Sequence, residues 1–187
     1  MARNVAVFVG SLRRESFTKK IANALAELAP PSLHLEQIEI GGLPHYNQDL
    51  DGESPPPEWR AFRDRVRGAD AVLFATPEYN RGVPGVLKNA IDVGSRPYGK
   101  SVWVKKPGAV ISVSPGVIGA FGANHALRQS MVFLDVPMMQ QPEAYISRVD
   151  ALLDRDGKLA DASTRDFLTK YLAALAAWIE RNVVARS

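Results

Sequence analysis

The sequence contains no cysteine. That absence excludes disulfide bonds, a thiolate nucleophile and every zinc site built on cysteine. The remaining soft metal ligands are His34, His45 and His125, and their spacing fits no tight metal-binding pattern. We therefore expect these histidines on the surface or in the core, and no resident metal.

Long hydrophobic runs are missing as well. The first apolar segment, Val5–Val9, has about five residues, whereas a membrane-spanning helix needs roughly 20 and a signal peptide needs a longer apolar region. We expect a cytoplasmic protein that does not use the membrane as a partner.

Charge of one sign is not in large excess. Lys and Arg number 23 and Asp and Glu 20, which gives a formal net charge of +3, and the two signs are interspersed. This balance argues against nucleic acid as the main partner. A length of 187 residues with 46% hydrophobic content suits one core, so we predict a single domain over residues 1–187.

Apolar strands alternate with amphipathic helices along the chain. Runs such as Val5–Val9, with no polar alternation, are typical of parallel strands covered on both faces. We expect strands at 5–9, 33–40, 70–75, 108–113 and 136–139, and helices at 16–29, 58–68, 84–94, 121–134 and from a cap at Ser163 onward. This pattern predicts an α/β, flavodoxin-like three-layer sandwich with a five-stranded parallel sheet of order 2-1-3-4-5.

Two charged segments admit more than one interpretation. Arg60, Arg63 and Arg67 share a predicted helix and could bind phosphate, but Glu58 and Asp64 interrupt the charge and favour a solvated face. Residues 154–157 begin like a calcium loop, yet no acidic residue stands at the far end, so a simple turn is expected.

Two loops should converge in the predicted sheet. In the order 2-1-3-4-5 the first and third strands are neighbours, and their following helices leave on opposite faces. The loop over residues 10–18 and the loop over residues 77–82 would therefore line one crevice, although about 60 residues separate them.

The first loop has the chemistry of an anion site. Ser11, Ser16 and Thr18 supply hydroxyls, and Arg13 and Arg14 supply positive charge. The start of a helix near Ser16 adds free amides at the positive end of the helix dipole. These groups suit a phosphate monoester.

The second loop offers groups for the polar edge of a flat heterocycle. Pro77, Glu78, Tyr79 and Asn80 provide a carboxylate, a phenol, an amide and main-chain groups. The segment from Ser114 to Gly116, after the fourth strand, would close the crevice on the other side.

Other phosphate-binding loops do not match. The Gly-Lys-Ser/Thr pattern of a P-loop is missing, and Gly10 lacks the further glycines of a dinucleotide fingerprint. Gly116, Gly119 and Gly122 recur every three residues, a repeat more typical of a tight turn. A mononucleotide fits the crevice better than a dinucleotide.

The sequence resembles a known family, the flavodoxin-like NAD(P)H-dependent FMN reductases, which include bacterial quinone and chromate reductases. The resemblance extends over essentially the whole chain. It rests on the segments Gly10-Ser-Leu-Arg13, Thr76-Pro-Glu-Tyr-Asn80, Pro84-Gly-Val-Leu-Lys-Asn-Ala-Ile-Asp92, Leu127-Arg-Gln129 and Phe133-Leu-Asp135.

The resemblance implies roles for individual residues. The FMN phosphate would be held by Ser11, Arg13, Ser16, Phe17 and Thr18. The isoalloxazine ring would contact Pro77, Glu78, Tyr79 and Asn80, with Ser114 near the same cofactor. The sequence departs from the family pattern at Thr18, where asparagine is common, at Ser114-Pro-Gly116, and at Ala120-Phe121, which interrupts a Gly-Gly pair.

The implied activity is that of an oxidoreductase. FMN would take a hydride from NADH or NADPH at N5 and pass two electrons to a small acceptor such as a quinone, a flavin, chromate, or a nitro or azo compound. The flavin carries this chemistry, so no catalytic side chain is expected. The alternatives are a flavodoxin-type electron carrier and a flavin-binding sensor. The family also implies a homodimer or a homotetramer.

Overall fold

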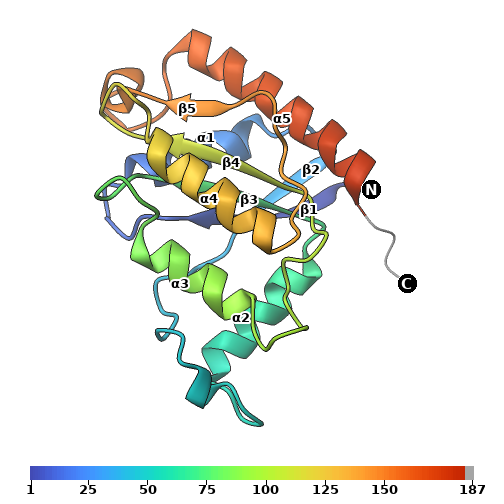
Figure 1. The fold of residues 1–187 in the computed structure, drawn as a ribbon. Helices are drawn as coiled ribbons and strands as arrows, with labels where there is room; N and C mark the ends of the chain where they lie inside the picture. The colour runs from blue at the N-terminus through green and yellow to red at the C-terminus, as the bar shows by residue number, and fades with distance from the viewer. Residues whose placement is uncertain (184–187) are drawn as a thin grey trace.

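A parallel sheet lies between two layers of helices (Figure 1). This is a computed structural model, and it describes residues 1–183. Its elements are β1 (Arg3–Val9), α1 (Phe17–Leu28), β2 (Leu33–Gln37), a 3-10 helix (Gln48–Leu50), α2 (Pro57–Gly68), β3 (Ala71–Thr76), α3 (Gly85–Gly94), β4 (Gly108–Val113), α4 (Phe121–Phe133), β5 (Ala144–Ile146), a second 3-10 helix (Val149–Leu152) and α5 (Ala162–Asn182). The five strands are parallel in the order β2-β1-β3-β4-β5, which confirms the predicted fold class.

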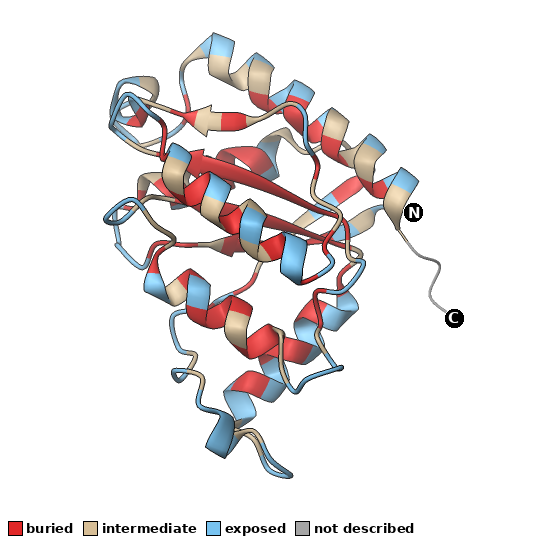
Figure 2. Ribbon diagram, in the orientation of Figure 1, coloured by how far each residue is buried: buried red, intermediate tan, exposed pale blue. Residues whose placement is uncertain are grey.

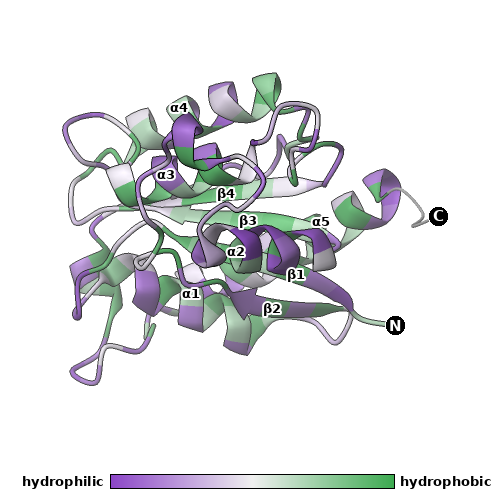
Figure 3. Cartoon of the chain, turned by 90° about the horizontal axis from the view of Figure 1, so that it is seen from below, coloured by the Kyte–Doolittle hydropathy of each residue, from purple (hydrophilic) through white to green (hydrophobic). Residues whose placement is uncertain are grey.

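The central strands are buried on both faces because successive side chains point to opposite sides of a sheet. In β1, Val5 and Val7 pack with α1 and α5, whereas Ala6 and Phe8 pack with α2, α3 and α4. β3 and β4 alternate in the same way. The central strands β3 and β4 are therefore buried in Figure 2 and mostly hydrophobic in Figure 3, between helices that carry both polar and apolar segments.

Aromatic rings fill the core on the side of α2 and α3. The ring centroid of Trp103 lies 5.4 Å from that of Phe8 and 5.9 Å from that of Phe74, and Phe62 packs edge-on against Phe8. The Trp103 indole N–H donates to the Ile91 carbonyl at 2.9 Å. The connection after α3 is thus tied to the core. None of the helices within residues 1–183 has the length and apolar character needed to cross a membrane.

The fifth strand was predicted in the wrong segment. Residues 136–139 run beside the start of β4 but form only an isolated bridge between Met138 and Gly108. Pro137 has no N–H to give to a ladder. The strand that pairs with β4 is β5, whose Ala144 and Ile146 lie opposite Ile111 and Val113.

Two element ends also differ from the prediction. β2 ends at Gln37 rather than at residue 40, and Ile38 and Ile40 turn into the core beside α2. α5 is capped by Asp161 and not by Ser163, because the Asp161 carboxylate accepts from the Thr164 amide at 2.7 Å. The turn predicted at residues 154–157 is confirmed, and an antiparallel bridge between Leu153 and Leu159 flanks it.

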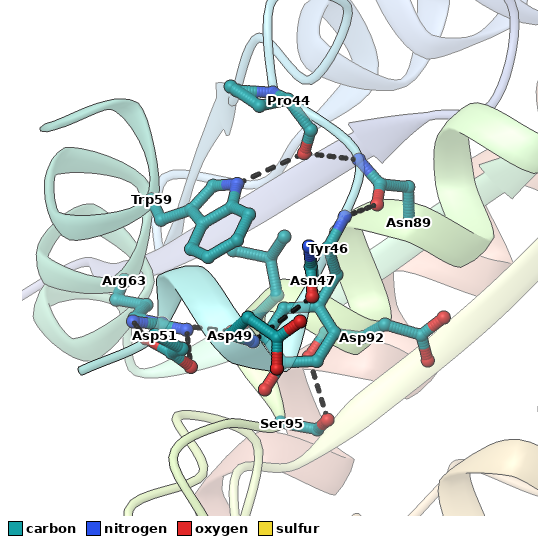
Figure 4. Close-up of polar contacts among 11 residues, drawn as sticks. Pro44, Tyr46, Asn47, Asp49, Asp51, Trp59, Arg63, Asn89, Asp92 and Ser95 are labelled. Carbon is teal, nitrogen blue, oxygen red and sulfur yellow. Dashed lines mark hydrogen bonds and ion pairs between the residues drawn. The ribbon is translucent and has the colours of Figure 1, made fainter. Parts of the chain in front are cut away.

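The long loop between β2 and α2 is fastened to α2 and α3 by polar contacts (Figure 4). The Asn89 side chain accepts from the Tyr46 amide at 2.8 Å and donates to the Pro44 carbonyl at 3.1 Å. The Trp59 indole donates to the same carbonyl at 3.0 Å. Most residues of this loop are exposed, so these few contacts fix its course.

Arg63 does not belong to a solvated arginine face, contrary to the prediction. Its guanidinium forms two hydrogen bonds to the Asp51 carboxylate, at 2.7 and 2.8 Å, and a third to the Val93 carbonyl at 2.9 Å. The two charged side chains are only 4% and 3% exposed. Removing one partner of such a pair leaves an uncompensated buried charge, which costs about 3–5 kcal/mol in other proteins.

Candidate functional site

The loops after β1 and β3 lie side by side, as predicted. Val9 is opposite Ala75 in the sheet, and the Gly10 amide donates to the Ala75 carbonyl at 2.8 Å. A Cβ atom at Gly10 would lie 3.1 Å from Leu87 and 3.2 Å from Pro77. Glycine at this position allows the two loops to approach each other closely.

A cavity of about 260 Å³ opens where the loops after β1, β3 and β4 meet. It is lined by Ser11, Arg13, Ser16, Phe17, Thr18, Pro77, Glu78, Tyr79, Val113, Ser114 and Pro115. Three residues predicted for the site, Arg14, Asn80 and Gly116, lie outside this lining. Two lining residues, Val113 and Pro115, were not predicted, and each adjoins the predicted Ser114 in the sequence.

The N-terminus of α1 forms one end of the cavity. The Ser16 hydroxyl caps the helix by accepting from the Lys19 amide at 3.2 Å. The amides of Phe17 and Thr18, in the first turn, have no intrahelical acceptor. The hydroxyls of Ser11 and Thr18 belong to buried residues and form no hydrogen bond within residues 1–183. This end of the cavity thus offers unused donors and the positive pole of a helix dipole.

The loop after β3 contains a tight turn. The Tyr79 amide donates to the Gly82 carbonyl at 3.2 Å, and the Gly82 amide donates to the Tyr79 carbonyl at 3.0 Å. The two central residues, Asn80 and Arg81, have φ values of 52° and 65°. These values are typical of a type I′ turn, in which Asn is favoured. Asn80 therefore lies at an exposed tip, outside the cavity wall.

Fewer main-chain donors face the cavity than the sequence indicated. Pro77 has no N–H, and the Tyr79 amide is bonded within the turn. The Pro77 carbonyl accepts from the Thr76 hydroxyl at 2.7 Å. In the segment from Pro77 to Asn80, only the amides of Glu78 and Asn80 are left for a ligand.

Glu78 has a structural contact that the sequence did not reveal. One carboxylate oxygen, Oε2, accepts from the Ala123 amide in the first turn of α4 at 3.0 Å. A Cβ atom at Gly122 would lie 2.8 Å from the same oxygen, so glycine makes room for it. The other oxygen, Oε1, pairs with the exposed Arg81 guanidinium at 3.3 Å. Glu78 thus joins the cavity wall to the N-terminus of α4, which has no side-chain cap of its own.

The turn after β4 has a fixed shape. The Ser114 hydroxyl accepts from the Gly116 amide at 2.9 Å, and the Ser114 amide donates to the Ile146 carbonyl at 2.9 Å. The Gly116 amide is therefore used within the turn. Ser114 and Pro115 form the wall of the cavity opposite α1.

The three histidines belong to no metal-binding group among the described residues. His34, His45 and His125 are all exposed. Within residues 1–183, no group of three or more His, Asp and Glu side chains is placed to hold a metal ion.

The fold and this cavity define a class of protein. A flavodoxin-like sheet with a helix N-terminus at one end of a crevice, and the Glu78 amide and an aromatic ring at the other, is suited to a phosphorylated flat ring such as FMN. Ser11 and Thr18 are buried residues whose hydroxyls form no hydrogen bond within residues 1–183, and these hydroxyls fit the phosphate end of that cofactor.

Comparisons with known proteins identify the family. Residues 3–151 match the model for NADPH-dependent FMN reductases, and the chain belongs to that family. It is 61% identical over 179 residues to a quinone reductase of Pseudomonas putida, with 96% of each chain covered. It is 48% identical over 179 residues to a 2-hydroxy-1,4-benzoquinone reductase of a Burkholderia species, covering 96% of this chain and 97% of that one.

A solved structure agrees with these relatives. The flavoenzyme NAD(P)H:acceptor oxidoreductase FerB of Paracoccus denitrificans superposes with a TM-score of 0.91 at 43% identity, covering 98% of this chain and 100% of that one. The protein is therefore an oxidoreductase of an FMN- and NAD(P)H-dependent family, as predicted. The cofactor roles of individual residues stay predictions.

Proposed function

We propose that the protein binds FMN in the cavity between the loops after β1, β3 and β4, accepts electrons from NADH or NADPH, and reduces quinones. The observation that carries this proposal is the cavity itself, where an anion-binding helix start meets the turn after β3. The names of the Pseudomonas and Burkholderia relatives support a quinone as acceptor. Free flavins, chromate, and nitro and azo compounds remain further candidate acceptors.

The phosphate end of the cofactor would lie at α1. The amides of Phe17 and Thr18 and the hydroxyls of Ser11 and Thr18 can donate to phosphate oxygens, and the Arg13 guanidinium supplies the cation. Ser16 acts indirectly, because its hydroxyl caps the helix and keeps the first-turn amides directed at the cavity. When bound, FMN supplies the two-electron chemistry.

The ring end would lie against the turn after β3. The Glu78 amide can donate to the polar edge of the ring, and the Tyr79 side chain covers one side. Asn80, at the exposed tip of the turn, would reach the ring only from outside the cavity wall. Ser114 and Pro115 limit the ring on the opposite side. These groups orient the ring and stabilise negative charge on it, as preorganised donors do in an oxyanion hole.

We place residues 1–187 in one FMN-binding domain, of which residues 184–187 lie outside the described part. The protein would act in the cytoplasm as a homodimer or homotetramer. A flavodoxin-type carrier or a sensor is disfavoured because the family consists of reductases.

Anaerobic spectroscopy tests the function. Purified protein saturated with FMN should retain it through gel filtration, and NADPH or NADH should bleach the yellow colour, which benzoquinone should then restore. A carrier or a sensor would stay yellow with either nicotinamide. Loss of FMN during gel filtration would overturn the proposal.

Arg13→Ala tests the placement of the phosphate. Removing a charged hydrogen bond of about 1.5–3 kcal/mol should raise the Kd for FMN by a factor of about 10 to 100. Arg60→Ala is the matched control, because Arg60 is an exposed cation on α2 and does not line the cavity. An unchanged Kd in Arg13→Ala would remove Arg13 from the phosphate site.

A further inference from the structure

A second cavity lies beside the phosphate end of the first. Its volume is about 210 Å³, and it opens between the loop after β1 and the end of β2. Its walls carry three exposed cations, Arg13, Arg14 and Lys19, and one carboxylate, Glu39. The two cavities share only Ser11 and Arg13. They therefore adjoin each other, and of the two cavities Arg14 and Lys19 line only the second.

Two carboxylates near these cations are already engaged. Glu15 pairs with Lys20 at 2.9 Å. This hydrogen bond is the main reason why the pKa of Glu15 lies below its ordinary value. Glu39 accepts from the amides of Ile40 and Gly41 through one oxygen, at 3.1 and 2.8 Å.

Arg14 and Lys19, in contrast, form no ion pair or side-chain hydrogen bond within residues 1–183. Both also line a third cavity of about 380 Å³, on the other side of α1, with Lys20 and Lys158. That cavity also carries Glu15, Glu27 and Asp156, so its charge is nearly balanced. The excess is larger in the 210 Å³ cavity, where three cations face one carboxylate, and this charge would attract an anion.

FMN does not account for this charge. Its single phosphate is matched by Arg13 and the start of α1, and neither Arg14 nor Lys19 lines the FMN cavity. The other ligand of the reaction is a dinucleotide, and NADPH differs from NADH by a 2′-phosphate that carries a charge of about −1.5 to −2, like other phosphate monoesters. An arginine beside a lysine is well suited to such a group.

We propose that Arg14 and Lys19 form a subsite for the 2′-phosphate of NADPH, and that this subsite makes the enzyme prefer NADPH to NADH. The inference rests on the proposed function, since the nicotinamide must reach a flavin in the adjoining cavity. Arg13 stands between the two anions and would contribute to both.

Steady-state kinetics with both nicotinamides tests this assignment. In Arg14→Ala and in Lys19→Ala, KM for NADPH should rise about tenfold or more, the effect of losing one charged hydrogen bond, whereas KM for NADH should change less than about twofold. Arg60→Ala removes the same charge from α2 and should change neither value. Equal changes of both KM values in Arg14→Ala and Lys19→Ala would overturn the subsite.

Calorimetry provides a readout that does not depend on turnover. 2′,5′-ADP, which carries the 2′-phosphate, should bind the FMN-saturated protein more tightly than 5′-AMP, and Arg14→Ala should abolish the difference while the Kd for FMN stays unchanged. Equal affinity of the two nucleotides for the unmodified protein would overturn the inference. Failure to retain FMN overturns the proposed function instead. In the FMN-free protein the subsite is then decided by whether Arg14→Ala abolishes the difference between the two nucleotides while Arg60→Ala does not.

Discussion

The sequence placed Glu78 correctly in the cavity wall but did not reveal its hydrogen bond to α4. The family resemblance put it at the flavin, and it does line the cavity. Its hydrogen bond to the Ala123 amide joins residues 45 positions apart in the sequence, and nothing in the local pattern around either residue indicates that contact. The pairing of β3 with β4 and the packing of α4 against β4 bring them together.

This contact gives a prediction at the residue scale. Glu78→Ala should lower the free energy of unfolding by about 1.5–3 kcal/mol, because it removes a charged acceptor and leaves the Ala123 amide unpaired. Chemical denaturation of the FMN-free protein measures the change without a contribution from the cofactor. Arg81→Ala is the control, since it removes only the 75%-exposed partner of the same carboxylate and should cost at most about 1 kcal/mol. Equal losses in the two variants would show that the bond to α4 is not the stabilising contact.

At the scale of elements, helices and central strands were predictable because their patterns are long or fully apolar. β3 and β4 are buried at every position, and continuous apolar runs of this kind are a strong signal. β5 has only three residues, too few for a pattern, and the apolar segment 136–139 took its place in the prediction. Pro137 lies in this segment where it meets β4, and the missing N–H of proline limits the pairing to one bridge.

The cap of α5 supports a prediction about pH. Hydrogen bonds from the Thr164 side chain and then from its amide lower the pKa of Asp161 in the folded protein. Because the folded-state pKa lies below the unfolded one, the ionised cap stabilises the protein above about pH 4, and this stabilisation is lost as the pH falls through the folded-state pKa. Asp161→Asn keeps a capping side chain but removes the charge.

Thermal melts from about pH 7 to about pH 3 measure this effect. The unmodified protein should melt above Asp161→Asn at neutral pH, and the gap should close below about pH 4. Ser163→Ala should change the melting temperature little at any pH, because Ser163 is exposed inside the first turn and is not the cap. A larger fall in melting temperature for Ser163→Ala than for Asp161→Asn would show that Ser163 is the cap, as the sequence predicted.

At the scale of the whole molecule, the topology decided most of the site. Once the order 2-1-3-4-5 is known, the loops after β1, β3 and β4 must end at the same edge of the sheet, so the convergence of Ser11–Thr18 with Pro77–Tyr79 followed from the sequence. The buried ion pair of Arg63 could not be predicted in this way. Its partner Asp51 lies in a loop without periodicity, and a buried ion pair leaves the same sequence pattern as two surface charges.

The apolar residues on the outside of α4 bear on the assembly of the molecule. Val132 and Phe133 are 80% and 79% exposed, and Phe121, at the other end of the helix, is 50% exposed. Exposed apolar groups gathered on one helix favour burial against another protein surface. The FMN cavity of about 260 Å³ is also smaller than the roughly 300–1,000 Å³ usual for small-molecule sites. Both observations support the proposed homo-oligomer, in which a second chain would cover more of the flavin.

The double variant Val132→Asp, Phe133→Asp should therefore be monomeric in sedimentation velocity, because two carboxylates would have to be buried in the interface without partners. Ala173→Asp is the control: Ala173 is exposed on α5, on the opposite face of the sheet, and that variant should keep the mass of the unmodified oligomer. If the second chain covers the flavin, the monomeric variant should also bind FMN more weakly than Ala173→Asp does. A monomeric unmodified protein, or a double variant that keeps the oligomer mass, would show that α4 is not the interface, and the flavin site would then belong to one chain alone.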